Sequence, residues 1–243
     1  MIVKSFLSPA DLTEESVKNT WVVVIDVLRA TSTIVTALHN GAKLVRPVAD
    51  TAEAIRIAGQ KRGEEILLAG EENGFKINGF DLGNSPLEYA HSVIYGKKII
   101  LKTTNGTRAF LNVQSAPKIL VGSFLNAQAA AGFLNRNLPE RVLFVNSGLQ
   151  GHFSLEDSVC SGYIISQLSE ADIRNDDACA AVELSRHFAS DVRAMFGQSR
   201  HGRYLKRNGF ETDLEFCAQK NIFKDIPVFD TDKRGIVLAQ MAG

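Results

Sequence analysis

The sequence has few cysteines, no long apolar run and no excess of either charge. Cys160, Cys179 and Cys217 are widely spaced and form no CxxC pair, which argues against a disulfide framework or a zinc site. The apolar runs are far shorter than the roughly 20 residues that a membrane helix needs, and the N-terminal stretch lacks the apolar block of a signal peptide. We therefore expect a cytoplasmic globular protein without a membrane partner.

The charged residues balance, with 27 Lys+Arg against 27 Asp+Glu in a chain of 243 residues. A neutral chain has no overall field to attract nucleic acid, so no nucleic-acid partner is expected. An anionic ligand would have to be held locally, either by positive side chains or by a metal ion.

Short apolar runs alternate with segments whose apolar residues recur three and four positions apart, which is the spacing of one helix face. Strands are expected at Val22–Ile25, Leu44–Pro47, Ile66–Ala69, Ile99–Lys102, Lys118–Val121, Val142–Val145 and Ile226–Val228, and helices at Thr51–Lys61, Ala127–Asn137 and Leu155–Leu168. This alternation predicts an α/β fold with a largely parallel, buried sheet and helices on both faces. No composition break divides the chain, so one domain over residues 1–243 is expected, with a helical excursion from Asp176 to Asp213.

Three of the expected strands end in polar turns. VVVID-VLRATS, IILKT-TNGTRA and LFVNS-GLQGHFSLED each run from an apolar strand into a polar or glycine-bearing turn and then into a helix. Open α/β sheets bind ligands beyond the carboxyl ends of their strands, where helix N-termini present unpaired N–H groups to anions. Three such junctions at one sheet edge would build one site. The alternative is that their hydroxyl groups only cap helices.

Asp26 and Arg29 are the main candidates at the first junction. Asp26 directly follows the strand, so its carboxylate is expected to face the crevice as a metal ligand or as a nucleophile. We favour the ligand role, because DVLRAT lacks the second acid of an aspartyl-phosphate scheme. Arg29 offers a planar fork for two oxygens of a phosphate or a sulfonate. A helix cap and a surface ion pair are the alternative roles of these two residues.

Two glycine-bearing loops supply further candidates. The segment GEENGFKINGFDLGNSP, residues 70–86, carries Glu71, Glu72 and Asp81, and such a loop suits Mg²⁺, which needs one or two carboxylates besides waters and substrate oxygens. In LKTTNGTRAF, residues 101–110, threonines surround an Asn-Gly turn, which predicts an anion-binding turn at a helix start. Ordinary surface turns, or a hairpin at the Asn-Gly pair, are the alternatives.

The segment NSGLQGHFSLEDSVCSG, residues 146–162, combines a helix start with two acids. Ser154 and Asp157 have the spacing of a capping box, which predicts that a helix begins here. Glu156 and Asp157 are adjacent and point about 100° apart on a helix, so we expect one of them at the site without choosing between them. His152 is either an acid or anion donor, or a solvated loop histidine.

Several common signatures are missing. The chain has no GxxxxGK[ST] loop, no GxGxxG turn and no GxSxG elbow, which argues against a P-loop nucleotidase, a dinucleotide-binding enzyme and the commonest serine hydrolases. Leu28 stands two residues after Asp26, so the DxD motif of the haloacid-dehalogenase phosphatases is also missing.

The sequence resembles the 2-phosphosulfolactate phosphatase (ComB-like) family over nearly its whole length. The resemblance is carried by VVVIDVLRATSTI, GFDLGNSPLEY, TTNGTRA, GHFSLEDSVCSG and the late SRHGRYLKRNGFETDLEFC. It implies a three-layer α/β/α sandwich with a largely parallel or mixed central sheet. It also implies a Mg²⁺-dependent phosphatase that hydrolyses 2-phospho-3-sulfolactate to 3-sulfolactate and phosphate, a step toward coenzyme M. Gln150 and His152 depart from the family pattern, where an acid and an arginine are expected, and this bears on the exact substrate.

The motifs and the resemblance together give three sets of site residues. The expected catalytic residues are Asp26, Arg29 and Glu71. The expected metal ligands or water-holders are Asp26, Glu71, Asp81, Glu156 and Asp157. The expected substrate-binding residues are Thr31, Ser32, Thr33, Asn84, Thr104, Asn105, Gly106, Thr107 and His201.

We expect the phosphate at Asp26, Arg29 and the Thr31–Thr33 turn. The sulfonate and carboxylate are assigned to the turn at residues 105–107, with Arg200 or His201. A solvated basic turn is the alternative for SRHG. A non-catalytic anion-binding protein and a phosphatase of another small organic ester are the alternative functions. The assembly is left open, with a homodimer as one arrangement.

Overall fold

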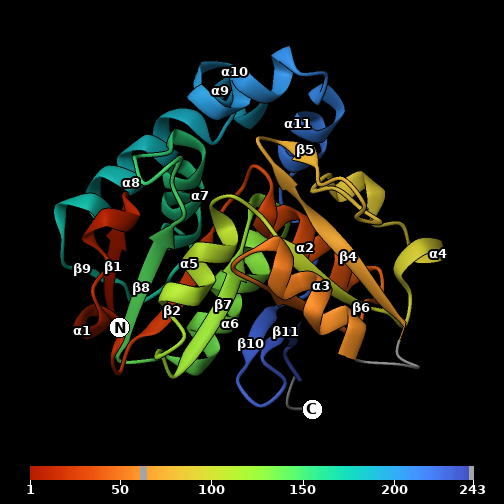
Figure 1. Cartoon of the computed structure of the whole chain (residues 1–243). Helices are drawn as coiled ribbons and strands as arrows, with labels where there is room; N and C mark the ends of the chain where they lie inside the picture. The colour runs from red at the N-terminus through yellow and green to blue at the C-terminus, as the bar shows by residue number, and fades with distance from the viewer. Residues whose placement is uncertain (61–64, 241–243) are drawn as a thin grey trace.

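A computed structural model describes residues 1–60 and 65–240 (Figure 1). The strands are β1 (Ile2–Phe6), β2 (Trp21–Ile25), β3 (Leu44–Pro47), β4 (Ile66–Glu72), β5 (Phe75–Lys76), β6 (Lys98–Lys102), β7 (Lys118–Gly122), β8 (Arg141–Asn146), β9 (Asp172–Ile173), β10 (Pro227–Asp230) and β11 (Gly235–Leu238). The α-helices are α1 (Glu14–Val17), α2 (Ala30–His39), α3 (Thr51–Gln60), α4 (His91–Ile94), α5 (Gly106–Asn112), α6 (Ala127–Asn137), α7 (Leu155–Ile165), α8 (Asp176–Phe188), α9 (Val192–Gln198), α10 (Arg200–Arg207) and α11 (Glu211–Cys217). Three 3-10 turns complete the described elements, at Pro9–Asp11, Pro86–Glu88 and Phe124–Asn126.

The described strands form one mixed sheet in the order β5-β4-β6-β3-β11-β10-β7-β2-β8-β1-β9. Parallel pairing joins β7, β2, β8, β1 and β9 in one half of the sheet and β3, β6 and β4 in the other. The β10–β11 hairpin lies between the halves and pairs antiparallel with both. The α/β class with a largely parallel or mixed sheet is thereby confirmed.

The β10–β11 hairpin is paired with each half of the sheet at a single position. It meets β7 at Val228↔Leu120 and β3 at Ile236↔Val45. Because strands twist at every step across a sheet, the two parallel halves are rotated relative to each other. Figure 1 shows the arrowheads of β4 and β8 both directed toward the region below α10. The carboxyl ends of both halves therefore converge there.

The alternation of side chains along β2 explains the layers. Val23 and Ile25 belong to a core with α6 and α7, whereas Val22 and Val24 belong to a second core with α2 and α5. All four of these side chains are completely buried, as expected for a central strand covered on both faces. A smaller core packs α3 against β4 and β6. Helices therefore cover both faces of the sheet.

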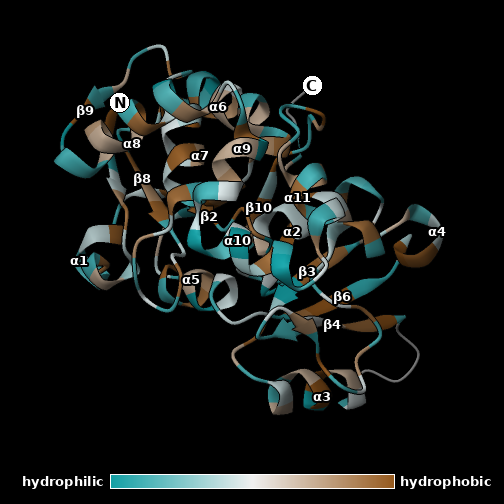
Figure 2. Ribbon diagram, turned by 90° about the horizontal axis from the view of Figure 1, so that it is seen from above, coloured by the Kyte–Doolittle hydropathy of each residue, from teal (hydrophilic) through white to brown (hydrophobic). Residues whose placement is uncertain are grey.

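The predicted helical excursion from Asp176 to Asp213 is confirmed by α8, α9, α10 and the start of α11. Figure 1 shows α9, α10 and α11 above the converging strand ends, and we call these three helices the cap. Figure 2 shows α10 largely in the hydrophilic colour, in keeping with its sequence RHGRYLKR. The cap thus brings a polar helix over the strand ends.

All seven predicted strands are present, with ends that differ by a few residues, whereas β1, β5, β9 and β11 were not predicted. The predicted helix at Thr51–Lys61 is α3, which ends at Gln60, and Lys61 lies outside the described residues. The helix predicted to Leu168 ends at Ile165. No helix within the described ranges is long and apolar enough to cross a membrane. The single domain stays a prediction.

Candidate active site

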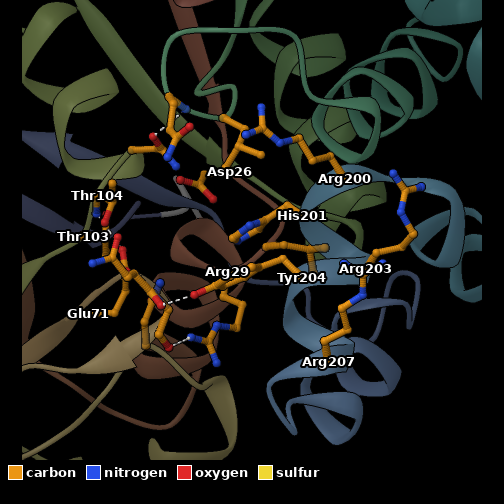
Figure 3. Close-up of a pocket in the computed structure, with 17 residues that line it drawn as sticks. Asp26, Arg29, Glu71, Thr103, Thr104, Arg200, His201, Arg203, Tyr204 and Arg207 are labelled. Atoms are coloured by element: carbon orange, nitrogen blue, oxygen red, sulfur yellow. Dashed lines mark hydrogen bonds between the residues drawn. The ribbon is translucent and has the colours of Figure 1, made fainter.

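A cavity of about 400 Å³ lies between the converging strand ends and α10 (Figure 3). Its lining residues come from the loops after β2, β4, β6 and β8 and from the cap: Asp26, Leu28, Arg29, Glu71, Asn73, Gly74, Asn84, Thr103, Thr104, Asn105, Leu149, Gln150, Arg200, His201, Arg203, Tyr204 and Arg207. All three polar junctions of the sequence contribute to this one cavity. Asp26 and Asn105 lie in the same wall, as the composite-site hypothesis requires.

Asp26 directly follows β2 and lines the cavity. Its backbone is fixed by Thr31, whose hydroxyl donates to the Asp26 carbonyl at 2.8 Å while its backbone N–H donates to the same oxygen at 2.9 Å. Gly106, the first residue of α5, packs closely against the Asp26 carboxylate. A Cβ added at Gly106 would lie 2.6 Å from Asp26 Oδ2 and 2.5 Å from the Cβ of Ala30. Only glycine leaves room for this approach.

Several acids share this corner of the structure. Burial, and then the neighbouring Glu71 and Glu156 carboxylates, raise the pKa of Asp26 to about 7, against weaker lowering by the Ala30 N–H and Arg29. Burial, and then Asp26 and Glu156, likewise raise the pKa of Asp157 well above its usual range. The carboxylates therefore repel one another in the absence of a positive ion.

The two adjacent acids of α7 have different surroundings. Asp157 Oδ1 accepts from the Val27 N–H at 2.8 Å, and Oδ2 accepts from the Gly148 N–H at 3.2 Å. Asp157 thus holds together the loops that follow β2 and β8. Glu156 is only 3% exposed and acts electrostatically on both Asp26 and His201.

Glu71 ties together two loops of the other half of the sheet. Its Oε1 accepts from the Thr104 N–H at 2.6 Å and its Oε2 from the Gly74 N–H at 2.7 Å. Asn84 lies in the same cavity wall, and its buried Oδ1 has no hydrogen-bond partner among the described residues. This oxygen is a buried acceptor without a partner, on a side chain that lines the cavity.

Arg29 is anchored on the cap. Its Nη1 donates to Asp213 Oδ2 at 2.5 Å, and its Nη2 donates to the Gly74 carbonyl at 2.5 Å. The guanidinium lies 4.2 Å from the ring centroid of Phe210, and Ser85 donates to the other oxygen of Asp213 at 2.6 Å. Arg29 lines the cavity (Figure 3), but two of its nitrogens donate within this buried network.

The cap wall of the cavity is rich in positive side chains. Arg200, Arg203 and Arg207 line it together with His201, whose ring stacks on Tyr204 with centroids 6.0 Å apart. Burial lowers the pKa of His201, against raising by Glu156, Glu71 and the Leu28 backbone, so this imidazole is neutral near pH 7. The permanent positive charge of the wall therefore belongs to the arginines.

The structure does not bring every predicted site residue to the cavity surface. The Thr31, Ser32 and Thr33 hydroxyls donate to the backbone carbonyls of Asp26, Val27 and Asn84, and the Thr107 hydroxyl donates to the Thr103 carbonyl. Asp81 is exposed and accepts from the Leu68 N–H at 2.8 Å, and it does not line the cavity. Asn105 does line it, and its Oδ1 accepts from the Gln150 N–H at 3.1 Å. His152 is exposed and does not line it.

Four side chains that shape the charge of the cavity or the position of Arg29 were not predicted from the sequence. Arg203, Tyr204 and Arg207 line the cavity, and Asp213 anchors Arg29. A signal for the first three was available, since cavity-lining residues of α10 recur three and four positions apart, the spacing of one helix face. Asp213 carried no such signal, because its partner is far away in the chain.

This cavity, with buried carboxylates on its sheet wall and arginines on its cap wall, defines an α/β protein with an active site for a small anion. The family model described as "2-phosphosulpholactate phosphatase" matches residues 6–232, and the chain belongs to that family. It is accordingly a phosphoric monoester hydrolase.

Similar proteins support the assignment. The chain is 41% identical over 225 residues to the "Probable 2-phosphosulfolactate phosphatase" of Clostridium perfringens (strain SM101 / Type A), with 91% of each chain covered. It is 38% identical over 238 residues to the protein of that name from Clostridium novyi (strain NT), with 96% of this chain and 99% of the relative covered. A third relative of that name, from Picosynechococcus sp., is 40% identical over 209 residues, with 85% of this chain and 86% of the relative covered.

Proposed function

We propose that the chain hydrolyses 2-phospho-3-sulfolactate to 3-sulfolactate and inorganic phosphate with the help of Mg²⁺. The observation that carries the proposal is the pairing of a carboxylate wall with an arginine wall across one small cavity. The names of the similar proteins support 2-phospho-3-sulfolactate as the substrate.

The charges of the cavity suit this substrate. Phosphosulfolactate carries a phosphate, a sulfonate and a carboxylate on a short carbon chain. Arginine is permanently charged and binds such groups through paired N–H donors, and three arginines of α10 line the cavity. A single mobile cation on the opposite wall would complete the neutralisation.

The residues present fit a Mg²⁺ ion at Asp26. Asp26 is a buried acid whose pKa is raised by the nearby buried acids Glu71 and Glu156, and the buried Asn84 Oδ1 has no partner among the described residues. Residues 1–60 and 65–240 contain no group of three His, Cys, Asp or Glu side chains placed to hold a metal by themselves. Mg²⁺ does not need one, because it is usually held by one or two carboxylates together with waters and substrate oxygens. When bound, Mg²⁺ polarises the phosphoryl group and lowers the pKa of bound water.

The side chains have distinct tasks in this proposal. In hydrolysis an oxygen of water attacks phosphorus, the ester P–O bond breaks, and the departing alkoxide takes up a proton. Asp26 holds the cation, and Glu71 fixes the loops that bear Gly74 and Thr104. His201, neutral and beside the acids, is placed to move a proton.

Phosphate release tests the proposal. The wild-type protein is assayed with 2-phospho-3-sulfolactate, 2-phospholactate and p-nitrophenyl phosphate, each with Mg²⁺ and with EDTA. We expect turnover of the first to exceed that of the others and to be lost in EDTA. Asp26→Asn should lose Mg²⁺-dependent turnover while its circular dichroism is unchanged. An active Asp26→Asn protein would contradict the role given to Asp26, and higher turnover of 2-phospholactate would contradict the substrate.

Three further properties belong to this proposal. With phosphosulfolactate as the substrate, the protein is proposed to act in the cytoplasm and on the route to coenzyme M. A homodimer is the proposed assembly, and light scattering with in-line chromatography measures it directly.

A further inference from the structure

Three arginines of α10 form a row in the cavity wall. Arg200, Arg203 and Arg207 are separated by three and four positions, which places them on one face of the helix. All three line the cavity, whereas Lys206 on the same helix does not. Figure 3 shows Arg200 and His201 extending toward Asp26, with Arg203 and Arg207 farther along α10.

None of these arginines has an acidic partner within the described parts of the chain. Arg203 donates to the Gln198 carbonyl, which leaves its charge unneutralised. Other cations of the cap are paired, since Lys206 contacts Glu211 at 3.5 Å and Arg193 contacts Glu215 at 2.6 Å. Like charges three or four positions apart destabilise a helix, so an anion bound between them would relieve that repulsion.

The other candidates for binding a second anion are occupied. Arg29 is paired with Asp213 and with the Gly74 carbonyl. The Thr107 hydroxyl is buried and donates to the Thr103 carbonyl, so the turn at residues 105–107 offers only Asn105 to the cavity. An anion beside the phosphate therefore has the α10 row as its main source of positive charge.

We propose that Arg203 and Arg207 form the subsite for the second strong anionic group of the substrate, with Arg200 between this subsite and the phosphate. The inference rests on the proposed function, and it replaces the turn at residues 105–107 as the binding site of the sulfonate. The α10 row selects phosphate monoesters whose alcohol carries a sulfonate or a carboxylate. Paired guanidinium N–H groups match the several oxygens of such a group.

Steady-state kinetics test the subsite. Arg203→Gln, Arg207→Gln and the double variant are compared with Lys206→Gln, which removes a positive charge from α10 outside the cavity. Contacts to a group remote from phosphorus act alike in the ground state and the transition state. Each substitution should therefore raise KM more than it lowers kcat. For each single variant we expect the loss of kcat/KM to be at least about tenfold larger with phosphosulfolactate than with p-nitrophenyl phosphate, since the lost hydrogen bonds are made by a charged donor to a charged acceptor. Lys206→Gln should keep the wild-type ratio.

Equal losses with both esters, or a kcat effect alone, would overturn the subsite. Binding of 3-sulfolactate, measured by calorimetry, separates this outcome from a failure of the proposed function. If the wild type does not hydrolyse phosphosulfolactate, the proposed substrate is wrong. The subsite still stands if 3-sulfolactate binds the wild type and Lys206→Gln alike and at least about tenfold more weakly to the double variant. Absence of wild-type binding, or equal binding by all variants, refutes the subsite.

Discussion

Asp26 is the residue on which the electrostatics of the site depend. It lies at the end of a central strand, beside two other acids, and its pKa is raised to about 7 by burial and by Glu71 and Glu156. When the Asp26 carboxyl group is protonated, the folded protein has one buried negative charge fewer beside Glu71 and Glu156. Protonation of Asp26 is therefore coupled to the stability of the metal-free protein.

The pH dependence of stability follows from this shift. Between about 3.8 and about 7 the folded chain keeps a proton at Asp26 that the unfolded chain has lost. The unfolding free energy in EDTA should therefore fall as pH rises through this window. Asp26→Asn cannot titrate, so urea unfolding at pH 8 should show it more stable than the wild type, on the order of 2–4 kcal/mol. Glu140→Gln, at an exposed position, is the control, and an equal slope for wild type and Asp26→Asn would contradict the expectation.

Gly106 is the second residue with a sharp prediction. A methyl group there would meet Asp26 Oδ2 at 2.6 Å and the Ala30 Cβ at 2.5 Å. Gly106→Ala should lower stability by about 1–3 kcal/mol through overpacking and should abolish phosphate release by displacing Asp26. Gly59→Ala is the matched control, since its Cβ would meet nothing within 4 Å, and it should stabilise α3 by roughly 0.5–1 kcal/mol. Wild-type turnover by Gly106→Ala would show that Asp26 tolerates displacement.

At the scale of elements, the cap is held to loops of both halves of the sheet. Arg29, after β2, reaches Asp213 of α11 and the turn between β4 and β5. Tyr204 of α10 donates to the Asn73 carbonyl of that turn at 2.8 Å. The rings of Phe75 and Phe210 lie 5.7 Å apart. The position of the α10 row over the cavity thus depends on contacts that both α10 and the α11 region make with loops of the sheet.

The Arg29–Asp213 pair is the contact whose loss should matter most. Both side chains are at most 3% exposed, and removing one partner leaves a buried charge without compensation. Asp213→Asn should lower the unfolding free energy by about 3 kcal/mol in urea denaturation. Glu215→Gln breaks the exposed pair with Arg193 and should change stability by less than about 1 kcal/mol. Similar effects of the two substitutions would show that the buried pair does not anchor the cap.

At the scale of the whole molecule, the sequence predicted the strands that are buried on both faces. VVVI in β2 and IIL in β6 could be recognised because each is a continuous apolar run. The strand β1, IVKSF, contains a lysine and a serine, and its place in the sheet depends on pairing with β8, more than a hundred residues away. Long-range pairing of this kind leaves little trace in a local pattern.

The residues of the candidate site also fall into those that the sequence predicted and those that it did not. Asp26, Glu71, Thr104 and Asn105 were predicted because strand ends of an α/β sheet meet at one edge. The hydroxyl groups of Thr31, Ser32 and Thr33 were predicted to bind the substrate, but in the structure they donate to backbone carbonyls. The prediction failed because a local hydrogen bond to the backbone uses the same side chains as an anion site. The spacing of the α10 arginines could have placed them on one helix face, but their place in the cavity wall depends on the folding of the cap back over the sheet, which is set by long-range contacts.

The two charged walls have a consequence for the order of events at the site. A cation on the carboxylate wall and an anion on the arginine wall attract each other across a narrow cavity, so each should raise the affinity of the other. Thermodynamic linkage makes this gain reciprocal and equal in free energy. Under the proposed function, the ester and Mg²⁺ would therefore strengthen each other's binding, whereas the dephosphorylated organic anion would lose its share of that gain. A cavity with opposed charges thus favours capture of the intact ester and release of its dephosphorylated product.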